Sequence, residues 1–187
     1  MVWVLCIFVL FFSSCEQKSQ ERHYTEIVLE APQVNSPNIP AATGILSWAV
    51  PQGWKEEPGE GMRLATFYLI ADPDAIDCSI VSLAGPVGGL NANLERWLRQ
   101  LGLQASDDSL NQLTSSVQIL KTKDGLEIKV FDFTTLQTQG LPSDKSMIAA
   151  MIVLDQTTVF VKMTGSVESV EKNKVNFLKL LGSFVRN

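Results

Sequence analysis

The 187-residue chain contains a single histidine, His23, and this scarcity excludes several kinds of catalytic site. Ser-His-Asp and Cys-His catalysis both need a histidine base beside the nucleophile. His23 lies in a polar stretch near the N-terminus, well before the segments with strand and helix patterns. A zinc site built from cysteine and histidine also lacks ligands. We therefore predict no metal, no cofactor and no catalytic residues, and an enzyme is the less favoured interpretation.

The chain also lacks a surplus of positive charge. Lys and Arg number 15 against 20 Asp and Glu, which gives a formal net charge of −5, and no window is rich in Lys and Arg. A groove that holds a nucleic acid backbone needs such a surplus on one face, so nucleic acid is excluded as a partner. The same acidic balance argues against docking on anionic lipid by charge alone.

The N-terminal apolar run is too short to cross a membrane. Residues 1–14, MVWVLCIFVLFFSS, carry no charge and are almost wholly apolar through Phe12, whereas a spanning helix needs about 20 apolar residues. The length fits the apolar region of a secretory signal peptide. The FSSC stretch at its end resembles the lipobox of bacterial lipoproteins, with Phe12 where leucine is usual and no Lys or Arg before the run.

The lipobox resemblance implies that residues 1–14 are a lipoprotein signal peptide and that Cys15 carries a diacylglyceryl thioether and an acyl chain. We thus expect a protein anchored through Cys15 to a membrane of the bacterial cell envelope, facing the periplasm or the exterior. Residues 15–43 hold four acids, two bases and three prolines. This composition predicts a lipidated N-terminus and flexible tether, followed by a single α+β domain over residues 44–187.

Cysteine is scarce as well, with three residues in the chain. Cys6 leaves with the signal peptide and Cys15 is used by the anchor, so Cys78 is alone in the mature chain and no intramolecular disulfide is available to it. Because Cys78 lies in the strand-like segment IDCSIVSL, we predict a small buried apolar residue rather than a nucleophile.

Runs of β-branched and aromatic residues between Gly, Pro and Asp turns predict an antiparallel sheet. The Asp124-Gly125 pair is a strong hairpin signal, and strands are expected over 45–50, 54–57, 62–70, 76–84, 117–136 as a hairpin, 147–154 and 157–165. Helical periodicity predicts helices over 90–101, 106–116 and 167–184. The order of elements predicts an α+β fold, an antiparallel sheet of about six to eight strands flanked by helices on one face or both.

The stretch GPVGGLNANLERWLRQLGL, residues 85–103, is the most distinctive in the chain. Its apolar residues fall on one helical stripe, and they are Leu90, Leu94, Trp97, Leu98 and Leu101. We expect Asn91 or Asn93 to cap the helix start and Gly102 to end it. The glycine spacing fits neither G-x-G-x-x-G nor a P-loop, so a tight turn before the helix is favoured over an anion site at its N-terminus.

Two family resemblances bear on the fold. The chain resembles a group of uncharacterised bacterial lipoproteins with W-x-x-P-x-G-W, G-M-R-x-A-x-F and G-G-L-x-x-N-x-x-R-W-x-x-Q-L-G elements, which begin here at Trp48, Gly61 and Gly88. That group supplies no activity. The order of elements, with a strand ending in Pro-x-Gly-Trp-Lys, is similar to the PsbP/Mog1 α-β-α sandwich. This second resemblance implies a binding or assembly factor rather than an enzyme.

Three arginines are the candidate contacts for a ligand or partner. Arg63 lies in a strand pattern, and Arg96 and Arg99 flank the apolar stripe of the helix. If Arg63 and Arg96 meet on one side, they form a small basic pocket in an acidic protein. The favoured function is a lipid-anchored extracytoplasmic binding or assembly module for an unknown protein or small ligand.

Two other functions remain open from the sequence. One is a hydrolase of the cell envelope that uses carboxylates, although no motif selects a pair. The acidic clusters are better explained as solvated turns than as catalytic carboxylates. They comprise Asp72, Asp74, Asp77, Glu56, Glu57 and Glu60. The other function is a structural envelope scaffold. Carboxylates of raised pKa in a cleft would favour the enzyme, an exposed apolar groove beside residues 90–101 would favour binding, and filled sheet faces would favour the scaffold.

Overall fold

The computed structural model describes residues 44–136 and 145–187, and the structural statements below concern these residues. Its strands are β1 (Leu46–Ser47), β2 (Trp54–Pro58), β3 (Arg63–Leu69), β4 (Ile76–Ala84), β5 (Gln118–Lys121), β6 (Glu127–Asp132), β7 (Lys145–Leu154), β8 (Thr157–Ser166) and β9 (Val185–Arg186). Its helices are α1 (Gly89–Gln100), α2 (Asp107–Ser115), the 3-10 helix η2 (Thr134–Leu136) and α3 (Val167–Gly182). None of these helices is long and apolar enough to cross a membrane.

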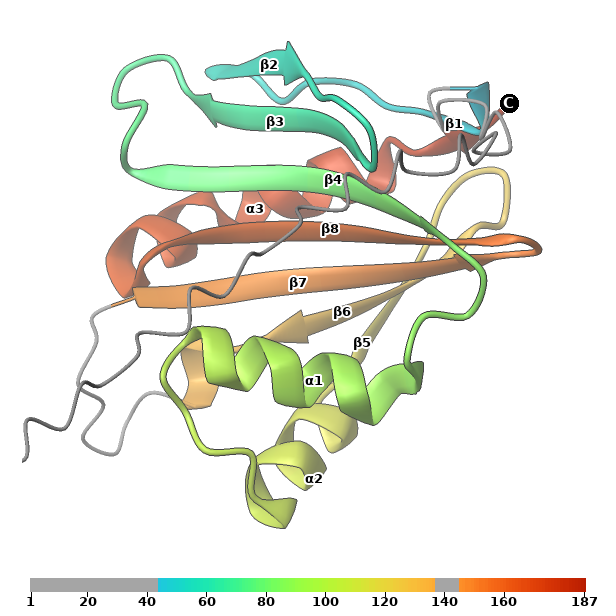
Figure 1. The fold of residues 1–187 in the computed structure, drawn as a ribbon. Coiled ribbons are helices and arrows are strands. Elements are labelled where there is room, and N and C mark those ends of the chain that lie inside the picture. The colour runs from blue at the N-terminus through green and yellow to red at the C-terminus, as the bar shows by residue number, and fades with distance from the viewer. Residues whose placement is uncertain (1–43, 137–144) are drawn as a thin grey trace, which may run out of the picture. The chain divides into compact units, whose positions relative to one another are not determined.

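Seven strands form one antiparallel sheet in the order β2-β3-β4-β8-β7-β6-β5 (Figure 1). Most neighbours are hairpin partners, and the central pairing of β4 with β8 joins Ile76–Ala84 to residues 157–165 over nine residues. The expected α+β fold with an antiparallel sheet of about six to eight strands is confirmed.

Helices cover both faces of the sheet. Figure 1 views the sheet from the side of α1 and α2, and α3 lies behind it. The core on the α3 side includes Phe67, Cys78, Val161 and Phe177, each with no exposed surface. Cys78 is therefore the small buried apolar residue that the sequence predicted, and its burial is the largest cause that raises the pKa of its thiol.

The core on the other face is built around Trp97 of α1. Its ring lies 6.1 Å from that of Phe131, 6.2 Å from that of Phe133 and 5.8 Å from that of Phe160, between ring centroids. The apolar stripe predicted for this helix is thus the surface that α1 buries, with Leu94, Leu98 and Leu101 also buried.

The start of α1 differs from the prediction. Its N-cap is Gly88, with a φ of 70°, and no side chain caps the first turn. Asn91 and Asn93 both lie inside the helix, and Asn93 is fully buried. Its Nδ2 donates to the carbonyls of Val87 at 2.8 Å and Gly89 at 2.6 Å, so it holds the glycine turn from within the helix. The cap prediction was wrong because the helix begins at Gly89, before both asparagines, and its N-cap has a positive φ that glycine adopts readily.

Two other local signals, Gly102 and the Asp124-Gly125 turn, are confirmed, and the second helix has a side-chain cap. Ser106 caps α2 through a reciprocal capping box with Ser109. Gly102 follows α1 with a φ of 75°, as a left-handed residue after a helix should. Asp124-Gly125 turns the chain between β5 and β6, with Gly125 at a φ of 81°.

The domain's two ends form a second, two-stranded sheet. Leu46 pairs with Arg186 and Ser47 with Val185, so the strand expected over 45–50 is shortened to two residues and β9 was not foreseen. Asp124 strengthens this sheet, because its Oδ2 accepts the backbone N–H of Arg186 at 2.8 Å. That hydrogen bond is the largest cause that lowers the pKa of Asp124.

Candidate functional site

The sheet face that α1 and α2 cover is apolar in one half and polar in the other. Directly paired residues of neighbouring strands point to the same face, and one such row runs from Thr66 through Ser79 and Lys162 to Ala149. Ala149 belongs to the Trp97 core, so the whole row faces the α1 and α2 side. Where the helices do not cover it, this face is polar.

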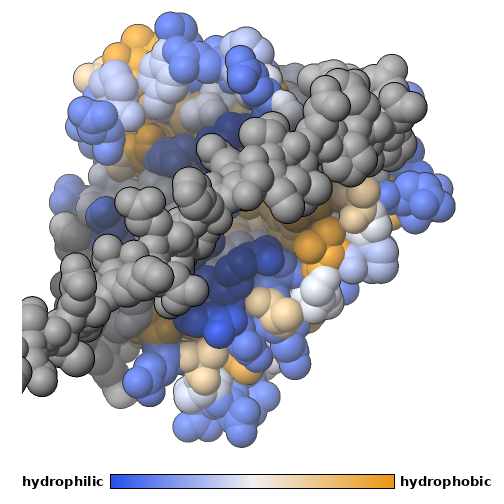
Figure 2. Space-filling view, in the orientation of Figure 1, coloured by the Kyte–Doolittle hydropathy of each residue, from blue (hydrophilic) through white to orange (hydrophobic). Residues whose placement is uncertain are grey.

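We name this polar part the open face. It is formed by β2, β3, β4 and β8, and its residues are Lys55, Glu57, Arg63, Thr66, Tyr68, Asp77, Ser79, Lys162 and Thr164. Figure 2 views the same side of the molecule and shows mostly hydrophilic residues, in blue, along α1. A hollow of about 420 Å³ opens on this face, with Glu57, Thr66, Tyr68 and Asp77 in its lining.

Arg63 lies across the middle strands of the open face. Its Nη1 donates to Oγ1 of Thr66 at 3.0 Å and is 3.9 Å from Oδ1 of Asp77. Both side chains of this ion pair are largely exposed, at 44% and 64%, so the pair is loose and well solvated. The guanidinium is thus held near Thr66, which lies in the same row as Lys162.

Lys162 is the residue that connects the open face to α1. Its Nζ donates to Oε1 of Gln100 at 3.0 Å. Its pKa is lowered, because burial disfavours the ammonium and Arg63 and Arg96 add like charge, while Asp77 acts in the opposite direction. The charges of Arg63 and Arg96, which come from distant parts of the sequence, therefore both act on Lys162.

Arg96 borders the open face from the helix. Its Nη2 donates to Oδ1 of Asn93, and its guanidinium carbon lies 5.9 Å from the centroid of the Phe160 ring, within the range of a cation–π contact. Arg99 points elsewhere. It pairs with Glu95 at 3.5 Å and is 67% exposed, so the structure does not bring it to Lys162.

Sequence reasoning selected Arg63 and Arg96 but missed Lys162. The signal was present in TTVFVKMTG, where strand alternation places Lys162 opposite in direction to Val161 and Met163, both fully buried. A lysine in such an apolar strand is a marker of a polar patch on the other face. The pairing of β4 with β8, which places Lys162 directly opposite Ser79, has no local signal.

The outer edge of the open face is held by paired charges and a ring. The hydroxyl of Tyr68 donates to Oε1 of Glu57 at 2.8 Å. Nζ of Lys55 lies 5.4 Å from the centroid of the Tyr68 ring and 3.8 Å from Oε1 of Glu57. On the open face, Lys55 and Glu57 of β2 therefore compensate each other's charge.

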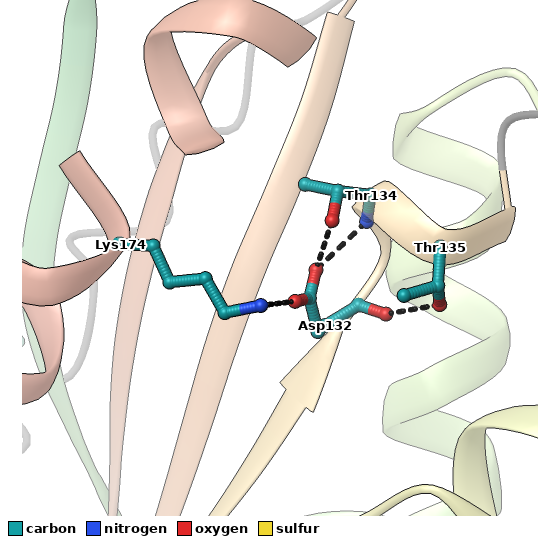
Figure 3. A network of polar contacts seen from close by, with 4 residues as sticks. All are labelled: Asp132, Thr134, Thr135 and Lys174. Atoms are coloured by element: carbon teal, nitrogen blue, oxygen red, sulfur yellow. Dashed lines mark hydrogen bonds and ion pairs between the residues drawn. The ribbon is translucent and has the colours of Figure 1, made fainter. Parts of the chain in front are cut away.

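A second polar cluster lies on the α3 side and is structural in character (Figure 3). Asp132 accepts from Nζ of Lys174 at 2.5 Å and from the backbone N–H and hydroxyl of Thr134 at 2.9 and 2.6 Å. Burial opposes the ionisation of Asp132, but these hydrogen bonds together lower its pKa. Lys174 of α3 thereby joins that helix to β6, beside a cavity of about 180 Å³.

The remaining candidate residues fall in several places. Glu56 accepts the indole N–H of Trp48 at 3.1 Å, and Glu57 is held by Tyr68. Within residues 44–136 and 145–187, no three His, Cys, Asp or Glu side chains are grouped as metal ligands. Cys15, the predicted lipid attachment site, and His23 lie outside the described residues.

Comparison with known proteins adds a likeness in fold. No family model matches the chain, and no curated protein matches it in sequence. The structure of cyanobacterial PsbP (CyanoP) from Synechocystis matches 77% of this chain and 94% of its own length, with 12% identity and a TM-score of 0.42. LpqN of Mycobacterium tuberculosis, a protein involved in cell envelope biogenesis, matches 76% of this chain and 83% of its own length, with 12% identity and a TM-score of 0.46.

A structure from Bacteroides thetaiotaomicron matches 76% of this chain and 45% of its own length, with 13% identity and a TM-score of 0.35. A PsbP protein is thus among the structures similar to this chain. The resemblance to a lipoprotein group stays a prediction. At these identities and TM-scores, the three structures carry no argument about function.

Proposed function

We propose that the protein is an extracytoplasmic binding or assembly module, anchored by lipid at Cys15, which holds a protein or small ligand on the open face. The open face itself carries the proposal. No helix among residues 44–136 and 145–187 covers this half of the sheet face, which is lined by polar groups and contains a hollow of about 420 Å³. A ligand can therefore contact these strands without displacing any part of the two cores.

The arrangement of charge supports binding of an anionic group. Arg63, Lys162 and Arg96 surround a spot where Asp77 is the nearby acid, although the chain as a whole has a net charge of −5. Charge complementarity of this kind favours a specific partner and raises the rate of encounter. The face beside α1 is polar rather than the apolar groove that the sequence led us to look for, so the binding that we propose depends on charge.

The two alternative functions receive less support. Among carboxylates with shifted pKa, Asp124 and Asp132 are both shifted downward, the direction opposite to the one that a general acid needs. A scaffold would fill both sheet faces, whereas the open face leaves part of one face uncovered by helix. No observation in the structure favours either function over binding.

The binding function is tested by photo-crosslinking in native cells. We would place a photoreactive phenylalanine analogue at Tyr68, in the open face, and at Val175, which is 62% exposed on α3. We expect position 68 to give a crosslinked product, identified by mass spectrometry, that position 175 does not give. The proposal fails if position 68 gives no product, or if both positions give the same products.

The anchor has its own test. Cys15→Ser removes the thiol that would carry the lipid, so the variant should move from the membrane fraction to the soluble fraction. Lys18→Ser, in the same polar stretch, is the matched control and should leave the protein in the membrane fraction. A Cys15→Ser variant that stays with the membrane would disprove the anchor without affecting the open face.

A further inference from the structure

Three cations reach one spot on the molecule from three different elements. Arg63 comes from β3, and its hydrogen bond to Thr66 at 3.0 Å places its guanidinium over the row that contains Lys162. Arg96 comes from α1 and lies against Phe160, which is two residues before Lys162 and points to the same face. Lys162 of β8 therefore lies between the two arginines, at the border of the open face and α1.

The charges at this spot are poorly compensated. Asp77 is, within the described part of the chain, the one carboxylate whose charge acts on Lys162, and at 3.9 Å its contact with Arg63 is too long for a hydrogen bond. Lys162 and Arg96 bond to the neutral amides of Gln100 and Asn93. Three like charges repel one another, and a bound anion is the simplest group that would relieve this repulsion.

Each of the three cations has more N–H donors than it uses in these hydrogen bonds. A lysine ammonium carries three N–H donors and an arginine guanidinium carries five, whereas Lys162 uses one in its bond to Gln100. The three side chains belong to three different elements, β3, β8 and α1. A planar carboxylate offers two oxygens, but a phosphate offers at least three, and arginine is well suited to bind it.

We propose that Arg63, Lys162 and Arg96 form a binding site for a phosphate group, with Thr66 at its edge. This inference rests on the proposed function, because it names the chemistry of the ligand that the open face holds. The organic part of a phosphate ester would lie in the adjoining hollow of about 420 Å³, whose lining includes Thr66, Tyr68 and Asp77. The phosphate can belong to a soluble small molecule or to a lipid headgroup.

The site is tested by NMR titration of the chain from residue 15 onward, with Cys15→Ser so that no lipid is attached. The probes are inorganic phosphate, glycerol 3-phosphate and acetate, each at constant ionic strength because such contacts are screened by salt. We expect phosphate and glycerol 3-phosphate to cause saturable shifts of the backbone amides near Arg63, Ser79 and Lys162, and acetate to bind at least about tenfold more weakly.

Matched variants separate the site from general charge. Lys162→Gln and Arg63→Gln should each weaken phosphate binding at least about tenfold, since each loses one charged hydrogen bond. Arg99→Gln, which removes a positive charge from the same helix as Arg96, should leave the affinity within about twofold. The NMR spectrum of each variant shows whether it has folded, and two independent variants keep the test decisive if one has not.

Three results would overturn the site: no saturable shifts near Lys162, equal binding of acetate and phosphate, or equal weakening by Arg99→Gln. Vesicles of phosphatidylglycerol and of phosphatidylcholine then identify the source. Binding to phosphatidylglycerol vesicles that is lost in Lys162→Gln indicates a lipid headgroup. Binding of glycerol 3-phosphate without binding to either kind of vesicle indicates a soluble ligand. A crosslink from position 68 without phosphate binding would contradict this site while supporting the proposed function. Phosphate binding without a crosslinked product would support the site and contradict a protein partner at position 68.

Discussion

Asn93 and Arg96 are joined side chain to side chain on α1, since Nη2 of Arg96 donates a hydrogen bond to Oδ1 of Asn93. The same asparagine donates its Nδ2 to the carbonyls of Val87 and Gly89. One buried amide therefore holds the glycine turn before the helix and positions an arginine at the border of the open face. Asn93 therefore contributes both to the local fold and to the position of a residue in the proposed binding site.

We predict that Asn93→Ala lowers the free energy of unfolding by about 2–3 kcal/mol, because it removes both hydrogen bonds of a buried amide, including the one to the Val87 carbonyl before the helix. Asn91→Ala is the matched control, since Asn91 is exposed on the same helix, and it should change stability by less than about 0.5 kcal/mol. Urea denaturation measures both values. Equal effects of the two substitutions would show that Asn93 does not hold the turn.

Local elements of the fold were predictable because their signals lie within a few residues. Ser106, with Ser109 three positions later, forms the capping box of α2, and Asp124-Gly125 makes the turn of its hairpin. The start of α1 was mispredicted because the choice between Gly88 and an asparagine depends on where the chain arrives from β4. That path is set by tertiary contacts, such as the hydrogen bond of the Thr158 hydroxyl to the carbonyl of Gly85 at 2.9 Å.

The candidate site was only partly predictable for the same reason. A strand pattern suggested that Arg63 points outward, and a helical stripe suggested that Arg96 lies at its edge. That both lie near Lys162 depends on the pairing of β4 with β8 across about 80 residues of sequence, which is set by the complete sheet rather than by local propensity. The β1 and β9 pair was missed on similar grounds, since two-residue strands carry no periodic pattern.

The Asp132–Lys174 pair predicts a specific pH dependence. The pKa of Asp132 is lowered in the fold, so its stabilising effect is present above its unfolded value of about 3.9 and is lost as the pH falls through the folded value. The pKa of Lys174 is raised, chiefly by its hydrogen bond to Asp132. The stabilisation from Lys174 is therefore present below its unfolded value of about 10.4 and is lost as the pH rises through the folded value.

We predict that Lys174→Met destabilises the protein by about 1–2 kcal/mol at pH 7, the size of a half-exposed charged hydrogen bond. The difference from the original protein should shrink as the pH falls through the lowered folded pKa of Asp132, where its carboxylate becomes protonated. Lys172→Met, at an exposed position on the same helix, is the control and should have little effect. Thermal unfolding across this pH range is the measurement, and a difference that does not depend on pH would contradict the role given to Asp132.

Cys78 should be almost unreactive in the folded protein. It is fully buried, and burial is the largest cause that raises the pKa of its thiol, so the thiolate that reacts with disulfide reagents is scarce and shielded. In a Cys15→Ser chain from residue 15 onward, modification should be at least about 100-fold slower in native buffer than in denaturant. Val175→Cys adds an exposed thiol that should react fast, and fast reaction of Cys78 itself would indicate local opening of β4.

Two glycines should respond to alanine in opposite directions. A Cβ at Gly165 of β8 would lie 2.5 Å from the carbonyl oxygen of Ala75, a clash with backbone that can be relieved only if the start of β4 moves. Gly165→Ala should therefore lower the free energy of unfolding by about 1–3 kcal/mol. At Gly182, the last residue of α3, a Cβ would meet nothing within 4 Å. Gly182→Ala should raise the free energy of unfolding by about 0.4–1 kcal/mol, because alanine loses less backbone entropy on folding. Chemical denaturation distinguishes the two, and stabilisation by both would mean that β8 and the loop before β4 do not approach as closely as their contact requires.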